Sequence, residues 1–208
     1  MTSTSVRLWR DNRDLAAAAL QHPFVRGLGN GSLPPTVFAA YVGQDAFFLE
    51  AFANAYAVAR AHSPDVGTRT AFTGLLEGVR DELALHSSYA AQLGIDLSAV
   101  EPGAATVSYT RFLGAMARLG NVAVTCAAMV PCMRLYAHVG ASLSATVPAS
   151  RYADWISTYS DPGFEQLART LEALLDAHAS QPEPVRPTYR RAMQLEIGFF
   201  DAALPLPI

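Results

Sequence analysis

The chain is poor in cysteine. Cys126 and Cys132 are its only cysteines among 208 residues. If both lie on one helix, they are about 9 Å apart along its axis, which is too far for a disulfide. A chain of this length buries roughly 70% of its unfolded surface and needs no disulfide or metal to hold a core. We therefore expect one domain over residues 1–208 in a reducing, cytoplasmic compartment.

Other absences exclude whole classes of partner. The net charge is −3, without the clustered basic residues of a nucleic-acid surface. The N-terminus, "MTSTSVRLWRDNRDL", has no apolar segment typical of a secretory signal. No run of about 18 apolar residues is free of charge and glycine, as a membrane span would require. We expect neither nucleic acid nor a membrane as partner.

No segment alternates with the two-residue period of a strand. The apolar residues recur instead at helical spacing, between boundaries marked mostly by proline. We predict an all-α, single-domain bundle of about seven or eight helices. The predicted ranges are 6–21, 35–62, 64–93, 107–119, 122–142, 148–158, 162–179 and 185–203. "RGLGNGSLP" is interpreted as a turn, and Ser63-Pro64-Asp65 as a helix start.

One proline breaks this pattern, because Pro131 falls inside the apolar segment "MVPCMRLY". A proline in a helix interior removes one backbone hydrogen bond and costs about 3 kcal/mol if unrelieved. We expect a kink around Val130–Pro131 that directs the Cys132 side chain between helices.

Three predicted helices each carry one reactive side chain on an apolar face. Asp45 and Glu196 lie at helical spacing from aromatic residues, and Cys132 lies one turn from Tyr136. A buried carboxyl is costly unless it is bonded or used, and burial raises its pKa toward neutrality. The ordinary alternatives are that both acids lie at a solvated edge and that Cys132, like Cys126, only packs.

Several catalytic and metal-binding motifs are missing. Glu82 and His86 are four residues apart, which we interpret as a structural hydrogen bond. A di-metal centre in a helical bundle needs Glu-x-x-His on two helices, and the sequence contains no such motif. It also has no C-x-x-C, no G-x-S-x-G and no glycine-rich phosphate loop after a strand. A di-metal site is therefore disfavoured, and we expect no bound metal.

Seven segments resemble, in order, those of the TenA family, the thiaminase II or aminopyrimidine aminohydrolase group. They are "HPFVRGLGNGSLP", "YVGQDAFFL", "DELALH", "SYTRFL", "MVPCMRLYAHVG", "YADWISTYSDPGF" and "LEIGFF". The resemblance implies a heme-oxygenase-like helical bundle, assembled as a homotetramer, with a dimer as the alternative. It also implies cofactor-free hydrolysis of 4-amino-5-aminomethyl-2-methylpyrimidine to the hydroxymethyl pyrimidine, or cleavage of thiamin.

The resemblance also implies roles for single residues. The family's pyrimidine-binding acid matches Asp45, its nucleophile Cys132 and its acid/base Glu196. Four further matches are substrate-binding aromatic residues: Tyr109, Tyr136, Tyr159 and Phe199. The chain departs from the family at Phe47-Phe48, where tyrosines are common. Phe48 is expected at the site with one hydrogen bond fewer than tyrosine would give, a difference of about 0.5–1.5 kcal/mol.

Two alternatives stay open at this stage. One is an oxidase or a pyrroloquinoline-quinone-synthase-like enzyme on the same fold. The other is a regulatory protein without enzymatic activity. The sequence also does not rank aminomethyl-pyrimidine, its formylated precursor and thiamin as substrates. It does not identify the group that lowers the pKa of Cys132 or takes its proton.

Overall fold

A computed structural model describes residues 2–145, 150–180 and 183–204. This part of the chain contains α-helices, one short 3-10 helix and no strand, so the all-helical prediction is confirmed. The α-helices are α1 (Thr4–Asp11), α2 (Arg13–Gln21), α3 (Pro23–Asn30), α4 (Pro35–Ala61), α5 (Val66–Gln92), α6 (Ala104–Arg118), α7 (Val122–Ser144), α8 (Ala153–Ser160), α9 (Pro162–His178) and α10 (Val185–Ala203). These ten helices in the described residues exceed the seven or eight that the sequence predicts.

The additional helices lie at the N-terminus. The predicted helix 6–21 is divided at Asn12, whose buried side chain donates a hydrogen bond to the Leu8 carbonyl. The predicted turn at residues 26–34 overlaps α3, which begins at Pro23 with the His22 side chain accepting from the Phe24 amide. The apolar pattern runs across both breaks, so periodicity alone did not reveal them.

Several predicted helix boundaries also differ from the structure, among them the start of α6 at Ala104 rather than at residue 107. The cap of α5 is Asp65, which accepts from the Thr68 amide at 2.8 Å, so the helix begins at Val66 rather than at Pro64. The predicted start of α8 at residue 148 lies outside the described residues, but residues 150–152 are not helical and α8 begins at Ala153. The last helix has the predicted bounds.

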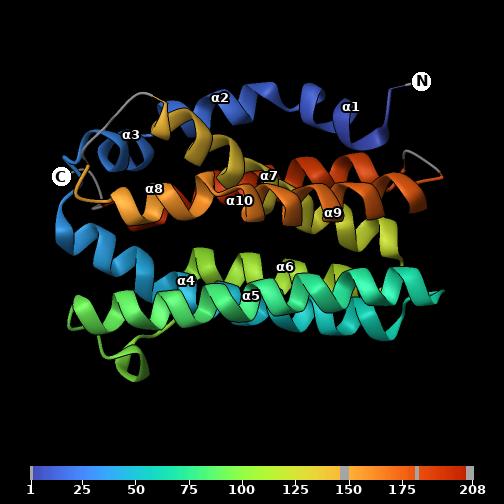
Figure 1. The fold of residues 1–208 in the computed structure, drawn as a ribbon, viewed down its shortest axis with the longest axis horizontal. Coiled ribbons are helices and arrows are strands. Elements are labelled where there is room, and N and C mark those ends of the chain that lie inside the picture. Colours follow the sequence, from blue (N-terminus) through green and yellow to red (C-terminus); the bar gives the residue numbers. More distant parts are fainter. Residues whose placement is uncertain (1, 146–149, 181–182, 205–208) are drawn as a thin grey trace.

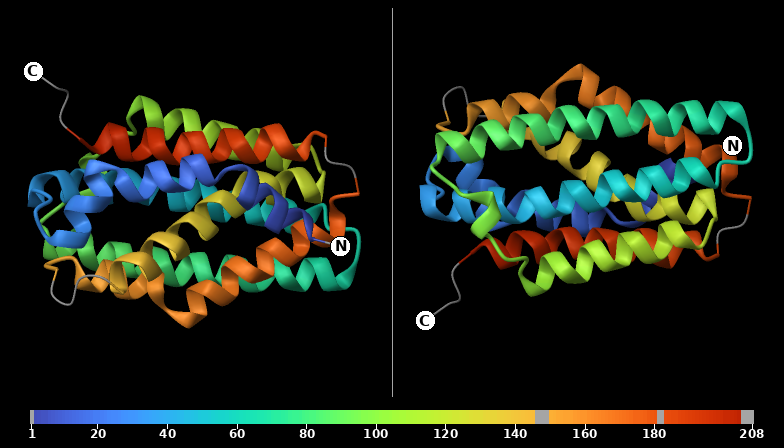
Figure 2. Two further views of the ribbon diagram at one scale, coloured as in Figure 1. Left: turned by 90° about the horizontal axis from the view of Figure 1, so that it is seen from above. Right: turned by 90° about the horizontal axis from the view of Figure 1, so that it is seen from below.

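The helix α7 lies at the centre of the bundle. Figure 1 shows α1–α3 along one long side and α4–α6 along the other, with α7–α10 between them. Figure 2 shows α7 crossing obliquely through the middle, where it contacts α4, α6, α8, α9 and α10. It continues through Pro131 without ending, and the kink stays a prediction.

By length and composition alone, α7 could span a membrane, although the sequence-based prediction contained no membrane-spanning segment. Its mean hydropathy is 1.4 over an 18-residue window, and 89% of that window is buried inside the protein. The apolar side chains of α7 are therefore explained by its packing against the other helices.

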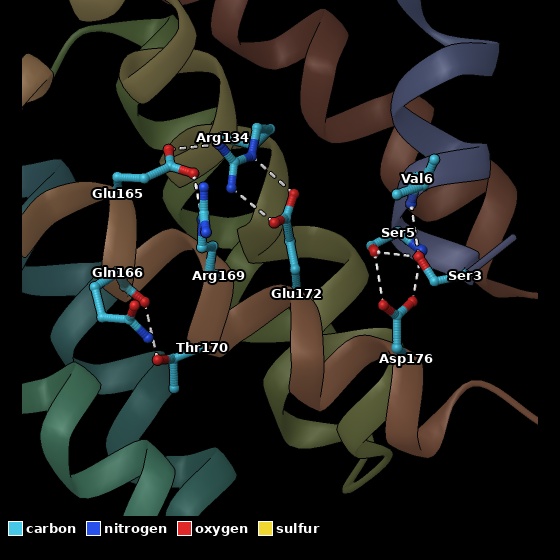
Figure 3. A network of polar contacts seen from close by, with 10 residues as sticks. All are labelled: Ser3, Ser5, Val6, Arg134, Glu165, Gln166, Arg169, Thr170, Glu172 and Asp176. Atoms are coloured by element: carbon cyan, nitrogen blue, oxygen red, sulfur yellow. Dashed lines mark hydrogen bonds and ion pairs between the residues drawn. The ribbon is translucent and has the colours of Figure 1, made fainter. Parts of the chain in front are cut away.

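An ionic cluster holds α9 against α7, as Figure 3 shows. The Arg134 guanidinium donates two hydrogen bonds to Glu172, at 2.8 and 2.7 Å, and one to Glu165 at 2.7 Å. One turn after Glu172 on α9, Asp176 accepts from the Ser5 amide and hydroxyl, each at 2.7 Å. These contacts fix α9 between α7 and α1.

A glycine allows α8 to lie directly on α7. A Cβ added at Gly140 would be 2.4 Å from the carbonyl carbon of Tyr159 and 2.6 Å from its oxygen. Both are backbone atoms, so no rotamer change relieves the clash. The absence of a side chain at Gly140 therefore sets how far Tyr159 reaches into the bundle.

We predict that Gly140→Ala lowers the free energy of unfolding by about 1–3 kcal/mol, because α8 must move away from α7. Gly74→Ala on α5 is the matched control, since its Cβ meets nothing within 4 Å. The control should gain about 0.5–1 kcal/mol from helix propensity. Urea denaturation of both variants measures this, and equal stabilisation of the two would contradict the close contact.

Candidate active site

Side chains from three helices surround one point on α7. Asp45 from α4 is 3% exposed, Cys132 on α7 is 8% exposed and Glu196 from α10 is 1% exposed. A cavity of about 10 Å³ lies against Asp45 and Cys132, with Phe48 and Tyr136 also in its wall. That volume has room for about one water molecule. The two acids are buried, so the solvated alternative for them is excluded.

Glu196 lies between Cys132 and a tyrosine. Its Oε1 accepts a 2.6 Å hydrogen bond from the Tyr109 hydroxyl on α6. Burial raises the pKa of Glu196 to about 8, and the hydrogen bond from Tyr109 opposes that rise. Near neutral pH this carboxyl therefore exchanges protons readily, as an acid/base group must.

Asp45 lies beside a histidine on α5. The Nε2 of His86 is 3.2 Å from Asp45 Oδ2, but the two atoms lack the alignment of a hydrogen bond. Burial raises the pKa of Asp45 to about 7, with a smaller opposing effect from the Tyr41 hydroxyl. Burial also lowers the pKa of His86. The Asp45 carboxyl therefore has little positive charge beside it in the protein. A cationic ligand would supply that charge.

A third carboxyl at the cavity escaped the sequence-based site prediction. Glu82 lines the cavity and accepts a 2.6 Å hydrogen bond from the Tyr159 hydroxyl. Burial raises the pKa of Glu82 to about 7. The interpretation of Glu82 and His86 as a hydrogen-bonded pair is not what the structure shows: Glu82 is bonded to Tyr159, and His86 is directed toward Asp45.

These surroundings keep the Cys132 thiol protonated. Burial raises its pKa well above 9.0, and the charges of Glu196, Glu82 and Asp45 raise it further. The sequence left open whether the site lowers this pKa or supplies a base. Since the pKa is raised, a nucleophilic Cys132 needs a base, and Glu196 is the carboxyl with the largest effect on it.

Aromatic rings form the rest of the enclosure. Phe48 packs with its ring centroid 4.8 Å from that of Tyr109 and 5.8 Å from that of Phe199. Tyr136 lies 4.8 Å from Tyr159 in an edge-on contact, and its hydroxyl is 3.2 Å from that of Tyr41. Flat apolar walls of this kind suit a flat heteroaromatic ring.

The structure thus brings together all the side chains that the sequence proposed for the site. They are Asp45, Phe48, Tyr109, Cys132, Tyr136, Tyr159, Glu196 and Phe199. Their roles stay predictions. Sequence reasoning missed Glu82, His86 and Tyr41 as neighbours of the site. The only sequence signal for them was the four-residue spacing of Glu82 and His86, which puts these two on one helix face.

Two further observations limit what the site can do. Among the described residues, no group of three or more His, Cys, Asp and Glu side chains is arranged to hold a metal ion. A second cavity, of about 580 Å³, shares Tyr41 and Phe199 with the site but has none of the three reactive side chains in its wall. Its polar lining residue Gln44 is already bonded to Gly103 and Thr106.

Comparison with known proteins gives one consistent family. A family model described as TENA/THI-4/PQQC matches residues 9–205. An aminopyrimidine aminohydrolase of Halalkalibacterium halodurans is 31% identical over 97% of this chain and 95% of its own length. The thiamine biosynthesis multifunctional protein ThiED of Corynebacterium efficiens is 32% identical over 94% of this chain, which spans only 28% of that protein.

A solved structure supports the fold. The crystal structure of a TenA family transcription regulator from Silicibacter sp. TM1040 superposes with a TM-score of 0.91. It is 28% identical and covers 99% of this chain and 98% of its own. The bundle and its topology are therefore those of solved TenA structures.

The buried carboxyls predict a pH-dependent stability. The pKa of Asp45 rises from 3.8 to about 7 on folding, so the folded protein holds this proton more tightly than the unfolded chain. The resulting stabilisation is complete below about pH 4 and is lost as the pH rises through about 7. Asp45→Asn, which removes the titration, should raise the free energy of unfolding at pH 8 by at least about 1 kcal/mol.

Chemical denaturation at pH 5 and at pH 8 measures this difference. The matched control is Glu50→Gln, an exposed carboxyl on the same helix, which should leave the pH dependence unchanged. An Asp45→Asn variant that keeps the wild-type loss of stability between the two pH values would show that Asp45 is not the group responsible.

Proposed function

The chain belongs to the TENA/THI-4/PQQC family, and on that basis we propose that it is an aminopyrimidine aminohydrolase of the thiaminase II type. Its substrate would be 4-amino-5-aminomethyl-2-methylpyrimidine, hydrolysed to the 5-hydroxymethyl pyrimidine and ammonia. The observation that carries the proposal is the Cys132 thiol between the buried carboxyls of Asp45 and Glu196, in an aromatic enclosure. We further propose a cytoplasmic homotetramer.

Asp45 and the aromatic walls would bind the pyrimidine, and the walls must separate to admit it, because the cavity between them holds about one water molecule. A carboxyl buried at Asp45 accepts hydrogen bonds from the amino group and a protonated ring nitrogen, and the pair would offset the burial cost of both charges. Phe48 and Tyr136 would contact the faces of the ring. Because Phe48 has no hydroxyl, it contributes packing and no hydrogen bond there.

The thiol would be activated by Glu196. The Glu196 carboxylate takes the proton of Cys132, and the sulfur forms a bond to an electron-poor ring carbon. The electrons displaced into the ring then expel the exocyclic amine, to which Glu196 returns the proton. The hydrogen bond from Tyr109 holds Glu196 in place for both transfers.

Water completes the cycle. It adds to the exocyclic carbon left by the amine and gives its proton to Glu196. The ring–sulfur bond then breaks, and the departing sulfur regains a proton from Glu196. The net change is amine plus water to alcohol plus ammonia, with no electron acceptor and no metal involved.

The test of this function is a hydrolysis assay with the purified protein. Aminomethyl-pyrimidine, its formylated precursor and thiamin are compared at equal concentration, and the pyrimidine alcohol is quantified. The proposal requires aminomethyl-pyrimidine to be hydrolysed. An inactive protein with stoichiometric iron would favour an oxidase on the same fold instead.

We predict that Cys132→Ala abolishes turnover but still binds aminomethyl-pyrimidine, because Asp45 and the aromatic walls remain. Calorimetry measures the binding and the alcohol assay the turnover. Cys126→Ala is the matched control on the same helix, since Cys126 is fully buried away from the cavity. Near-normal turnover in Cys132→Ala would rule out the covalent route.

We predict that Glu196→Gln lowers kcat by about 10²- to 10⁴-fold, the usual contribution of a general acid/base group. In the wild type, the rate should rise with pH as Glu196 loses its proton around pH 8. That rise should disappear in the variant. Asp201→Asn, at an exposed carboxyl on the same helix, should keep it. An unchanged pH–rate profile in Glu196→Gln would remove Glu196 from this role.

A further inference from the structure

Two cavities share one wall at Glu82. The small cavity at Cys132 and a surface pocket of about 340 Å³ are both lined by Glu82 and Phe164. The surface pocket lies between α5, α8 and α9, and Asp81 and Asp161 are also in its wall. Glu82 is therefore the titratable side chain common to the reaction site and to the outside.

The carboxyl of Glu82 is held in this position by Tyr159. Its Oε1 accepts the 2.6 Å hydrogen bond from Tyr159, whose backbone is fixed against Gly140. The ring of Phe164 packs edge-on against Tyr159, 5.0 Å away between centroids. Glu82 is partly exposed, whereas Asp45 and Glu196 are buried.

A second titratable group continues inward from Glu82. His86 lies one turn further along α5, and the charge of Glu82 acts on it. Its Nε2 is 3.2 Å from Asp45 Oδ2, and its Nδ1 has no hydrogen-bond partner among the described residues. Glu82 and Asp45 line the same small cavity, and His86 lies beside Asp45, so the three groups connect the surface pocket with the proposed pyrimidine-binding carboxyl.

The proposed reaction needs such a connection, and the inference rests on that function. An alkylamine is mostly an ammonium ion near neutral pH, as the side chain of lysine is. The step in which Glu196 protonates the amine requires the free amine. When the amine binds as an ammonium ion and leaves as neutral ammonia, each turnover moves one proton from the site to solvent, and the ammonia takes up a proton only after it leaves.

We propose that Glu82, with His86 behind it, transfers this proton between the reaction site and the surface pocket. The ammonium proton passes to Asp45 or His86, then to Glu82, and from Glu82 to water or buffer in the pocket. No bond other than those to the moving proton is made or broken. Glu82 is a proton-transfer residue in this scheme, distinct from the nucleophile and from Glu196.

The electrostatic surroundings suit the transfer. Burial raises the pKa values of Glu82 and Asp45 alike to about 7, so a proton moves between them without a large energy difference. The groups that face Glu82 are Asp45 on α4, His86 on α5, Cys132 on α7, Tyr159 on α8 and Asp161 before α9. None of these is a fixed cation that would repel the proton.

The test is Glu82→Gln, in which the amide oxygen still accepts from Tyr159 but the side chain cannot titrate. In dilute buffer we expect kcat for aminomethyl-pyrimidine to fall by about 10²-fold, with KM within about twofold. Added imidazole should restore the rate in proportion to its concentration, because a small base in the surface pocket replaces the missing carboxyl. Glu82→Asp, which keeps a carboxyl, should need no imidazole.

The control is Glu77→Gln, an exposed carboxyl five residues earlier on α5, which should behave as the wild type. A wild-type rate in Glu82→Gln, or a low rate that imidazole does not restore, would overturn the proton-transfer role while leaving the hydrolase function standing. A wild-type protein without hydrolase activity would overturn both.

Discussion

The burial of carboxyl groups beside the Cys132 thiol is the constraint on which the rest of the site depends. Three acids from α4, α5 and α10 lie around one stretch of α7, where burial raises the pKa of each and the charge of Asp45 raises the pKa of the other two further. Their pKa values consequently lie between about 7 and about 8, where a carboxyl both gives and accepts protons. The same burial that costs stability at high pH brings these pKa values close to neutrality.

Close packing and hydrogen bonds around α7 hold these buried carboxyls in place. Gly140 lets α8 approach until Tyr159 reaches Glu82, and Tyr109 holds Glu196 from α6. On the opposite side, Arg134 fixes α9 through two glutamates. The reactive groups are therefore placed by helices packed against one another, so small displacements of a helix would alter several pKa values together.

Helical periodicity predicted the all-α fold and the bounds of α10, because apolar spacing is a local property of each segment. It did not predict the break at Asn12 or the helix after Pro23, since both depend on side-chain hydrogen bonds that the spacing does not encode. Asp45, Cys132 and Glu196 were found as polar residues on apolar faces. Glu82 was not identified as a site residue, because its position at the site depends on Tyr159 and on a surface pocket lined partly by other helices.

The most direct test of the central claim is the titration of Cys132 in the free protein. In a Cys126→Ala background, thiolate ultraviolet absorbance is followed with pH, and a variant that also lacks Cys132 is the blank. Burial among three carboxyls predicts no thiolate up to pH 9.0, the ordinary thiol pKa. A thiolate that appears near pH 7 would contradict it, since the site would then lower the pKa of its nucleophile and need no base.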